Sequence, residues 1–95
     1  MIRNVVVGKL KPGVDLAAVE PALAAVAALR PDGLLDSRLG TDLRLREQGW
    51  DFAITSDFVD EASYRAYDQD AEHNRIRAEL FAPICEQIVR VQLQA

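Results

Sequence analysis

The sequence predicts an α+β fold of ferredoxin-like βαββαβ order, with two helices on one face of a four-stranded antiparallel sheet. Three observations lead to this prediction. Segments rich in β-branched residues alternate with segments of helical periodicity in that order, and turn signals separate them. The length of 95 residues suits a single domain spanning 1–95.

The chain opens with a predicted strand and helix. Residues 2–10 are rich in β-branched residues and end at a Pro-Gly turn, as strands often do. Asp15 is a plausible N-cap for the helical stripe that follows. Because Pro21 is tolerated only near a helix start, the regular helix is expected to begin around Val19 or Glu20, or to be kinked there.

Two further strands form the predicted central hairpin. Residues 34–45 mix apolar and charged types, and Gly40 within them predicts a bulge or a break. Residues 50–58 alternate more clearly. The face of this strand that is predicted to be apolar carries Trp50, Phe52, Ile54 and Phe58.

The last part of the chain predicts a helical region and a final strand. Asp60 is a good N-cap, and Pro83 ends the helical region. Two interpretations of this region stay open, a continuous helix and a helix broken near residues 68–70. Residues 85–93 then predict the fourth strand.

The outer face of the sheet is predicted to pair with a second copy of the chain. Val5, Val6 and Val7 follow one another in the first strand, so apolar side chains point to both faces. Ile88, Val89 and Val91 repeat the pattern in the last strand. Since no segment remains to cover the open face, the expected partner is an identical chain. The alternative is that Val7 or Ile88 is an isolated exposed apolar residue.

Composition narrows the classes of function. The net charge of −4 argues against nucleic-acid binding, and no run approaches the length of a membrane span. The N-terminal residues do not resemble a secretory signal, so a cytoplasmic location is expected. Cys85 is the only cysteine and is expected to be a buried, inert thiol. No metal site and no cofactor are predicted, because calcium-loop, phosphate-loop and dinucleotide-binding motifs are missing from the sequence.

His73, the only histidine, is the candidate for acid–base chemistry. In a continuous helix, Tyr67, Asp70 and His73 would lie near one side. A histidine tuned by a neighbouring carboxylate can act as a general base, and a tyrosine hydroxyl can stabilise an oxyanion. The alternative is that His73 is a surface or capping residue and that the tyrosine packs in the core.

Several segments together resemble the stress-responsive A/B barrel domain family of the dimeric α/β-barrel superfamily. The similar segments cover almost the whole chain: Ile2 to Gly13, Gly40 to Asp42, Trp50 to Asp60, and then Tyr64, Tyr67 and His73. The resemblance implies a homodimer in which the open sheet faces pack together, and most members of the family lack an assigned reaction.

The resemblance also implies a pocket between the sheet and the helices. One plant member is a polyketide cyclase that uses two histidines and a tyrosine. Its helix histidine corresponds to His73, its tyrosine to Tyr67, and its strand histidine to Asn4, which cannot act as a base. A further histidine common in the family corresponds to Asp70.

Three functions therefore remain in view. The first is binding or transformation of a small apolar or aromatic carbonyl compound in a pocket lined by Asn4, Val6, Tyr67 and His73, with His73 and Tyr67 as the catalytic candidates. The second is a stress-associated structural oligomer without catalysis. The third is an enzyme similar to a polyketide cyclase or a cofactor-free monooxygenase.

Overall fold

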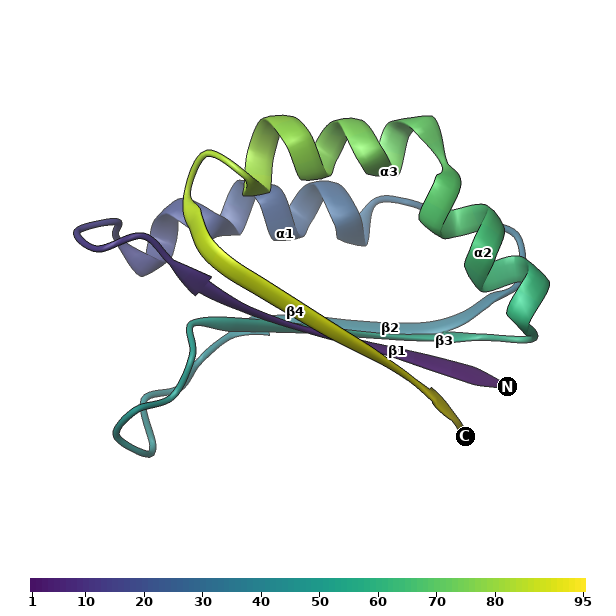
Figure 1. The fold of residues 1–95 in the computed structure, drawn as a ribbon, viewed down its shortest axis with the longest axis horizontal. Helices are drawn as coiled ribbons and strands as arrows, with labels where there is room; N and C mark the ends of the chain where they lie inside the picture. Colours follow the sequence, from purple (N-terminus) through teal and green to yellow (C-terminus); the bar gives the residue numbers. More distant parts are fainter.

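A computed structural model describes all residues, 1–95, and has the predicted order of strands and helices. The four strands are antiparallel to their neighbours in the order β2-β3-β1-β4, and the helices lie together on one face of the sheet (Figure 1). The ferredoxin-like fold is thus confirmed. The elements are β1 (Ile2–Leu10), η1 (Leu16–Val19), α1 (Glu20–Ala27), β2 (Leu34–Thr41), β3 (Phe52–Phe58), α2 (Glu61–Gln69), α3 (Ala71–Ile76), η2 (Arg77–Phe81) and β4 (Cys85–Gln94).

The start of the first helical segment agrees with the sequence. The Asp15 carboxylate accepts a hydrogen bond of 2.8 Å from the Ala17 backbone N–H and so caps the 3-10 turn η1. The α-helix α1 then begins at Glu20, with Pro21 in its first turn, where the missing N–H of proline costs no helical hydrogen bond.

The second helical region is broken, so the interpretation as one continuous helix is wrong. Asp60 caps α2 by accepting from the Ser63 N–H, and α2 ends at Gln69. Asp70 takes an extended conformation, with ψ of 133°, and its carboxylate caps α3. The chain changes direction here because the backbone of Asp70 is not helical (Figure 1).

The irregularity in β2 lies at the start of the strand and not near Gly40. The pairing register with β3 shifts between Leu34 and Asp36, directly after the turn at Gly33, whose φ is +83°. Gly40 pairs regularly with Ala53, and a side chain at Gly40 would meet no atom within 4 Å. The prediction of a bulge at Gly40 is therefore wrong, whereas the strand predicted to continue to residue 45 does stop near this glycine, at Thr41.

The hydrophobic core lies between the sheet and the helices. Its buried members come from η1, α1, α3 and η2 and from β1 and β3: Leu10, Val19, Ala22, Leu23, Val26, Phe52, Ile54, Ile76 and Phe81. Trp50 precedes β3 and is only partly buried. The prediction that it lies on the core face of this strand is therefore wrong. Cys85 is also only partly buried, and burial raises the pKa of its thiol. None of the helices combines the length and the apolar character that a membrane span requires, and the cytoplasmic location stays a prediction.

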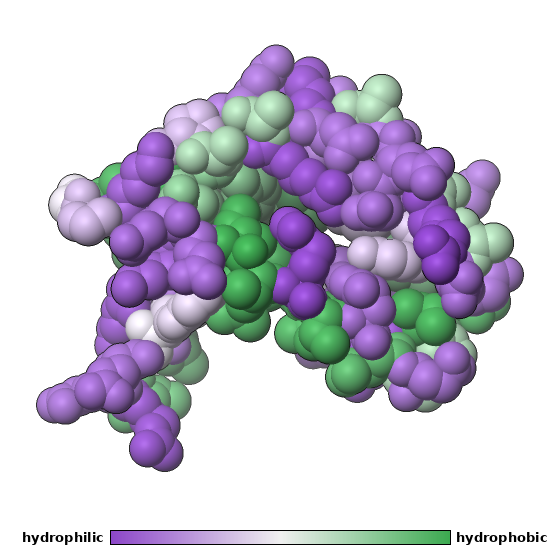
Figure 2. All heavy atoms as spheres, in the orientation of Figure 1, coloured by the Kyte–Doolittle hydropathy of each residue, from purple (hydrophilic) through white to green (hydrophobic).

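The other face of the sheet carries a stripe of apolar residues without a covering layer. Val5 and Val7 of β1 lie opposite Val91 and Val89 of β4, on the side away from the helices. Val89, Val91 and Leu93 keep 43%, 51% and 48% of their surface exposed. Figure 2 shows hydrophobic surface along the lower side of the molecule, below the sheet. Two-sided apolarity is therefore a property of the folded chain.

Candidate functional site

A small cavity lies between the sheet and the helical layer. It has a volume of about 40 Å³, enough for a few water molecules. The space-filling view is hollowed at this level, where hydrophobic and polar side chains adjoin (Figure 2). The lining comes from β1, β3, β4 and the helices: Asn4, Val6, Val26, Phe52, Ile54, Tyr67, His73, Arg77, Phe81, Ile88 and Arg90.

His73 is buried at the polar end of this cavity, with only 6% of its surface exposed. Its Nδ1 lies 3.0 Å from the backbone carbonyl oxygen of Tyr67. Because a carbonyl only accepts hydrogen bonds, Nδ1 carries the proton and Nε2 of the neutral ring is left as an acceptor. The interpretation of His73 as a surface residue is therefore wrong.

The environment of His73 favours its neutral form. Burial, and then the nearby positive charge of Arg77, lower the pKa of the imidazole from its usual 6.5. The negative charge of Asp70 acts in the opposite direction and raises the pKa of the imidazole, but it is the weakest of these influences, so it does not set the protonation state as the sequence suggested. The Asp70 carboxylate accepts a 2.9 Å hydrogen bond from the backbone N–H of His73 and so acts mainly as the cap of α3.

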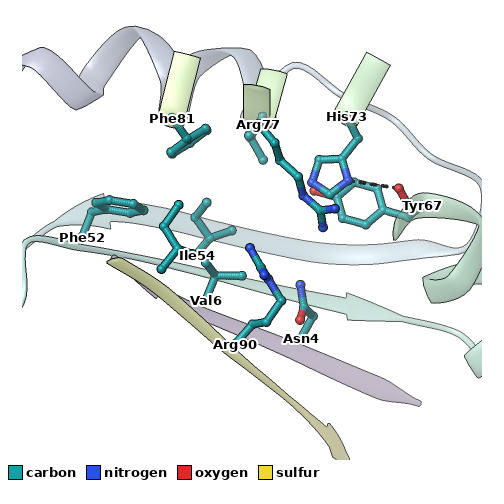
Figure 3. Close-up of a pocket in the computed structure, with 11 residues that line it drawn as sticks. Asn4, Val6, Phe52, Ile54, Tyr67, His73, Arg77, Phe81 and Arg90 are labelled. Atoms are coloured by element: carbon teal, nitrogen blue, oxygen red, sulfur yellow. Dashed lines mark hydrogen bonds between the residues drawn. The ribbon is translucent and has the colours of Figure 1, made fainter. Parts of the chain in front are cut away.

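Tyr67 stacks against the imidazole of His73. The two ring centroids are 3.9 Å apart, and the ring planes are inclined by 23°. Burial raises the pKa of the Tyr67 hydroxyl to about 12, so the group stays protonated near neutral pH and can donate a hydrogen bond. Figure 3 shows the phenol beneath the imidazole, with its hydroxyl end toward the cavity.

Asn4 and Val6 reach the same cavity from β1. The Asn4 side chain is 4% exposed, and its Oδ1 accepts a 2.9 Å hydrogen bond from Nε2 of Gln92 on β4. Its amide nitrogen remains as a donor on the cavity side (Figure 3). The structure thus brings together Asn4, Val6, Tyr67 and His73 around one cavity, while their binding and catalytic roles stay predictions.

Two arginines that line the cavity, Arg77 and Arg90, were not among the site residues predicted from the sequence. Arg77 on η2 donates to the Asp68 carboxylate at 2.8 Å and to the Asn74 side chain at 3.0 Å. Arg90 on β4 lines the same cavity, pairs in register with Val6, and has no acidic partner within salt-bridge distance. The sequence of β4 could have indicated the position of Arg90. Side chains alternate along a strand, so Arg90 lies on the same face as Ile88, which is the face that the helices cover.

The cavity has an apolar end and a polar end. Phe52, Ile54 and Phe81 lie toward one end, whereas His73, Tyr67, Asn4, Arg77 and Arg90 lie toward the other (Figure 3). The polar end offers several hydrogen-bond donors and one unprotonated imidazole nitrogen. Such a set can orient a carbonyl group and accept a proton from a neighbouring carbon or oxygen.

No three His, Cys, Asp or Glu side chains are grouped as metal ligands would be. The titratable groups of the cavity are instead a single histidine, a tyrosine and two arginines.

Solved structures of similar fold include proteins with and without a known activity. A dimeric ferredoxin-like protein of unknown function from Thermobifida fusca is 28% identical, with a TM-score of 0.86 over 99% of this chain and 90% of that chain. A hydroxynitrile lyase from Passiflora edulis is 22% identical, with a TM-score of 0.80 over 97% of this chain and 90% of that chain. SnoaB, a cofactor-independent oxygenase from Streptomyces nogalater, is 17% identical, with a TM-score of 0.78 over 99% and 91%.

These likenesses support the fold and leave the reaction open. No curated protein matches the chain in sequence. The family model for the stress responsive A/B barrel domain, by contrast, matches residues 2–94, which is nearly the whole chain. The chain is therefore a member of the stress-responsive A/B barrel domain family.

Proposed function

We propose that this chain binds a small apolar or aromatic molecule with a carbonyl group in the cavity between sheet and helices. The observation that carries the proposal is that the cavity is apolar at one end and polar at the other. Aromatic and aliphatic side chains line the apolar end, and His73 lies beside Tyr67 at the polar end. Cavities with an apolar wall and a few convergent polar groups are the usual form of small-molecule sites.

If the bound molecule is transformed, His73 is the proposed base. Its Nδ1 is occupied by the Tyr67 carbonyl, so the lone pair on Nε2 is the one that can accept a proton. The protonated Tyr67 hydroxyl or the Asn4 amide would donate to the carbonyl oxygen of the ligand. Asn4 takes no part as a base, because an amide has no basic site at neutral pH.

The cavity of about 40 Å³ is smaller than an aromatic ligand, so binding requires side chains at its edge to move. Arg90 suits this role because it is exposed and holds no ion pair. We therefore expect the bound form to be enlarged by rotation of this side chain.

Acetophenone, an aromatic carbonyl compound, is a suitable probe. A ligand that binds only the folded state raises the melting temperature, so acetophenone should raise that of the wild-type protein. Val6→Phe fills the cavity from β1 and should remove the shift, whereas Arg65→Gln, on the exposed side of α2, should retain it. Equal shifts in wild type and Val6→Phe would show that acetophenone binds elsewhere and would contradict the proposal.

We also propose that the chain is a homodimer formed through the open sheet faces. The apolar stripe of β1 and β4 supports this, since an isolated sheet face in water is expected to alternate with polar residues. The protein from Thermobifida fusca is itself described as dimeric.

The hairpin loop of residues 42–51 would extend the same interface. It projects from the sheet on the side away from the helices (Figure 1) and carries Leu43 and Leu45, which are 79% and 83% exposed. A groove of about 480 Å³ lies between this loop and the sheet, with Val7 and Trp50 in its lining. In a symmetric dimer, the exposed leucines of one loop could pack into the apolar groove of the identical chain.

A structural oligomer without catalysis is the second candidate, and the small size of the cavity favours it. It predicts an unchanged melting temperature with every carbonyl probe while the dimer persists.

A further inference from the structure

The polar end of the cavity contains more positive charge and more donors than a neutral carbonyl needs. Arg77 and Arg90 approach it from opposite sides, Arg77 from the helical layer and Arg90 from the sheet (Figure 3). The Tyr67 hydroxyl and the Asn4 amide add two neutral donors, and Nε2 of His73 is the one unprotonated ring nitrogen.

The two arginines differ in how far their charge is already neutralised. Arg77 donates to the Asp68 carboxylate at 2.8 Å, which balances its charge and fixes its position. Arg90 makes no ion pair, although the chain as a whole has a net charge of −4 and many carboxylates are paired with arginine elsewhere. An unpaired guanidinium beside an apolar cavity in an acidic protein is a local feature and not a consequence of overall charge.

We propose that the cavity binds ligands that carry a carboxylate on an apolar or aromatic body, and that Arg90 recognises this carboxylate, with Arg77 beside it. This inference names the ligand class of the proposed function and rests on that function. The planar guanidinium matches a carboxylate through two parallel hydrogen bonds, whereas a neutral amide of the same shape offers only one acceptor oxygen. The apolar body would lie toward Phe52 and Phe81, which are at the other end of the cavity.

Benzoate and benzamide form a matched pair of probes, because they have nearly the same shape and differ in charge. Titration of the wild-type protein, followed by calorimetry, should show benzoate binding about tenfold or more tightly than benzamide, as expected for a charge-assisted hydrogen bond. Arg90→Gln should remove this preference by weakening benzoate alone. Arg90→Lys, which keeps the charge and loses the planar fork, should retain part of it.

Arg65→Gln is the matched control, since Arg65 is an exposed arginine paired with Glu61 and lies outside the cavity lining. It should leave both affinities unchanged. Arg90 is exposed and unpaired, so its variants should fold with wild-type circular dichroism and melting temperature, which separates lost binding from lost structure.

The possible outcomes separate this inference from the proposed function. Equal affinity for both probes, removed by Val6→Phe, would overturn the carboxylate preference and leave the cavity as an aromatic binding site. A benzoate preference that persists in Arg90→Gln would also overturn the role of Arg90. Failure of both probes and of acetophenone to bind would overturn the proposed function and this inference with it.

Discussion

At the scale of single residues, the structure gives His73 a defined chemical state. The sequence contains one histidine and two tyrosines, so Tyr67 and His73 could be selected without coordinates. The burial of His73 and its stacking on Tyr67 could not be predicted in this way, because both depend on the break in the helix between the two residues.

The depressed pKa of His73 predicts a specific dependence of stability on pH. The folded protein holds the ring neutral, through burial and the charge of Arg77, whereas the unfolded chain protonates it near pH 6.5. Below that pH the unfolded state therefore binds more protons, and the free energy of unfolding should fall as the pH drops from 7.5 to 5. Urea unfolding at several pH values measures this slope.

The variant His73→Gln provides the comparison, since glutamine does not titrate and His73 is the only histidine. The difference in stability between wild type and His73→Gln should shrink as the pH falls through this range. A difference that is constant with pH would mean that His73 has an ordinary pKa in the folded state. The paired carboxylates, such as Asp68, have lowered pKa values and titrate below this range.

Gly8 is a second residue whose identity is required by packing. A Cβ atom at Gly8 would overlap the ring of Phe52, which is 2% exposed and packs against Phe81 with the ring centroids 5.6 Å apart. Gly8→Ala should therefore lower the free energy of unfolding by about 1–3 kcal/mol, as overpacked cores do. Gly40→Ala, where the added atom meets nothing within 4 Å, should change it little in the same denaturation experiment.

At the scale of elements, the boundaries that depend on local chemistry were predictable and those that depend on pairing were not. Asp15 and Asp60 mark helix starts because a carboxylate can cap the free N–H groups of the first turn. The register shift at the start of β2 results from pairing with residues of β3 that lie 21 or more positions later in the chain, and no local signal marks it. The charges at Arg77 and Arg90 converge only after the sheet and helices have packed.

The break between α2 and α3 is the element that constructs the candidate site. In a continuous helix the Tyr67 carbonyl would accept from the backbone N–H four residues later. Here it accepts from the Asp70 N–H at 3.2 Å and from His73 Nδ1 at 3.0 Å. The Asp70 carboxylate caps α3 through the backbone N–H of His73 itself, so the cap that starts α3 also holds the backbone that carries the imidazole.

Removal of that cap should disturb His73 specifically. Asp70→Ala should lower the free energy of unfolding by about 1 kcal/mol, the usual cost of an N-cap, and should shift the imidazole ¹⁵N resonances of the sole histidine. Asp70→Asn keeps an oxygen acceptor and should preserve both. Unchanged imidazole resonances in Asp70→Ala would show that stacking on Tyr67 alone orients the ring.

At the scale of the whole molecule, one face of the sheet forms the core and the other is left apolar and bare. The two-sided apolarity of β1 and β4 was visible in the sequence, because three valines in succession cannot all face the helices. The direction in which the loop of residues 42–51 projects was not visible in the sequence. It depends on the salt bridges that Arg44 makes with Asp42 at 3.3 Å and with Asp51 at 2.7 Å. Arg44 itself has a positive φ of 57°, which turns the loop between the two leucines.

The proposed dimer can be tested by placing charge on the bare face. Val91 lies opposite Val5 at the centre of the apolar stripe, and burying a carboxylate there against a second copy would be costly. Val91→Asp should therefore convert a dimer into a monomer in sedimentation velocity at micromolar concentration. Val59→Asp, at a valine that is 50% exposed but outside the sheet, should leave the dimer intact.

The loop gives a graded version of the same test. Replacing Leu43 and Leu45 together by serine should weaken dimerisation without abolishing it, because the stripe on the sheet remains. The two leucines are so exposed in the single chain that serine should cost little stability in the monomer. A wild-type protein that sediments as a monomer at micromolar concentration would overturn the sheet-to-sheet dimer. In that case the apolar stripe and the loop of residues 42–51 would have to be covered by a different partner.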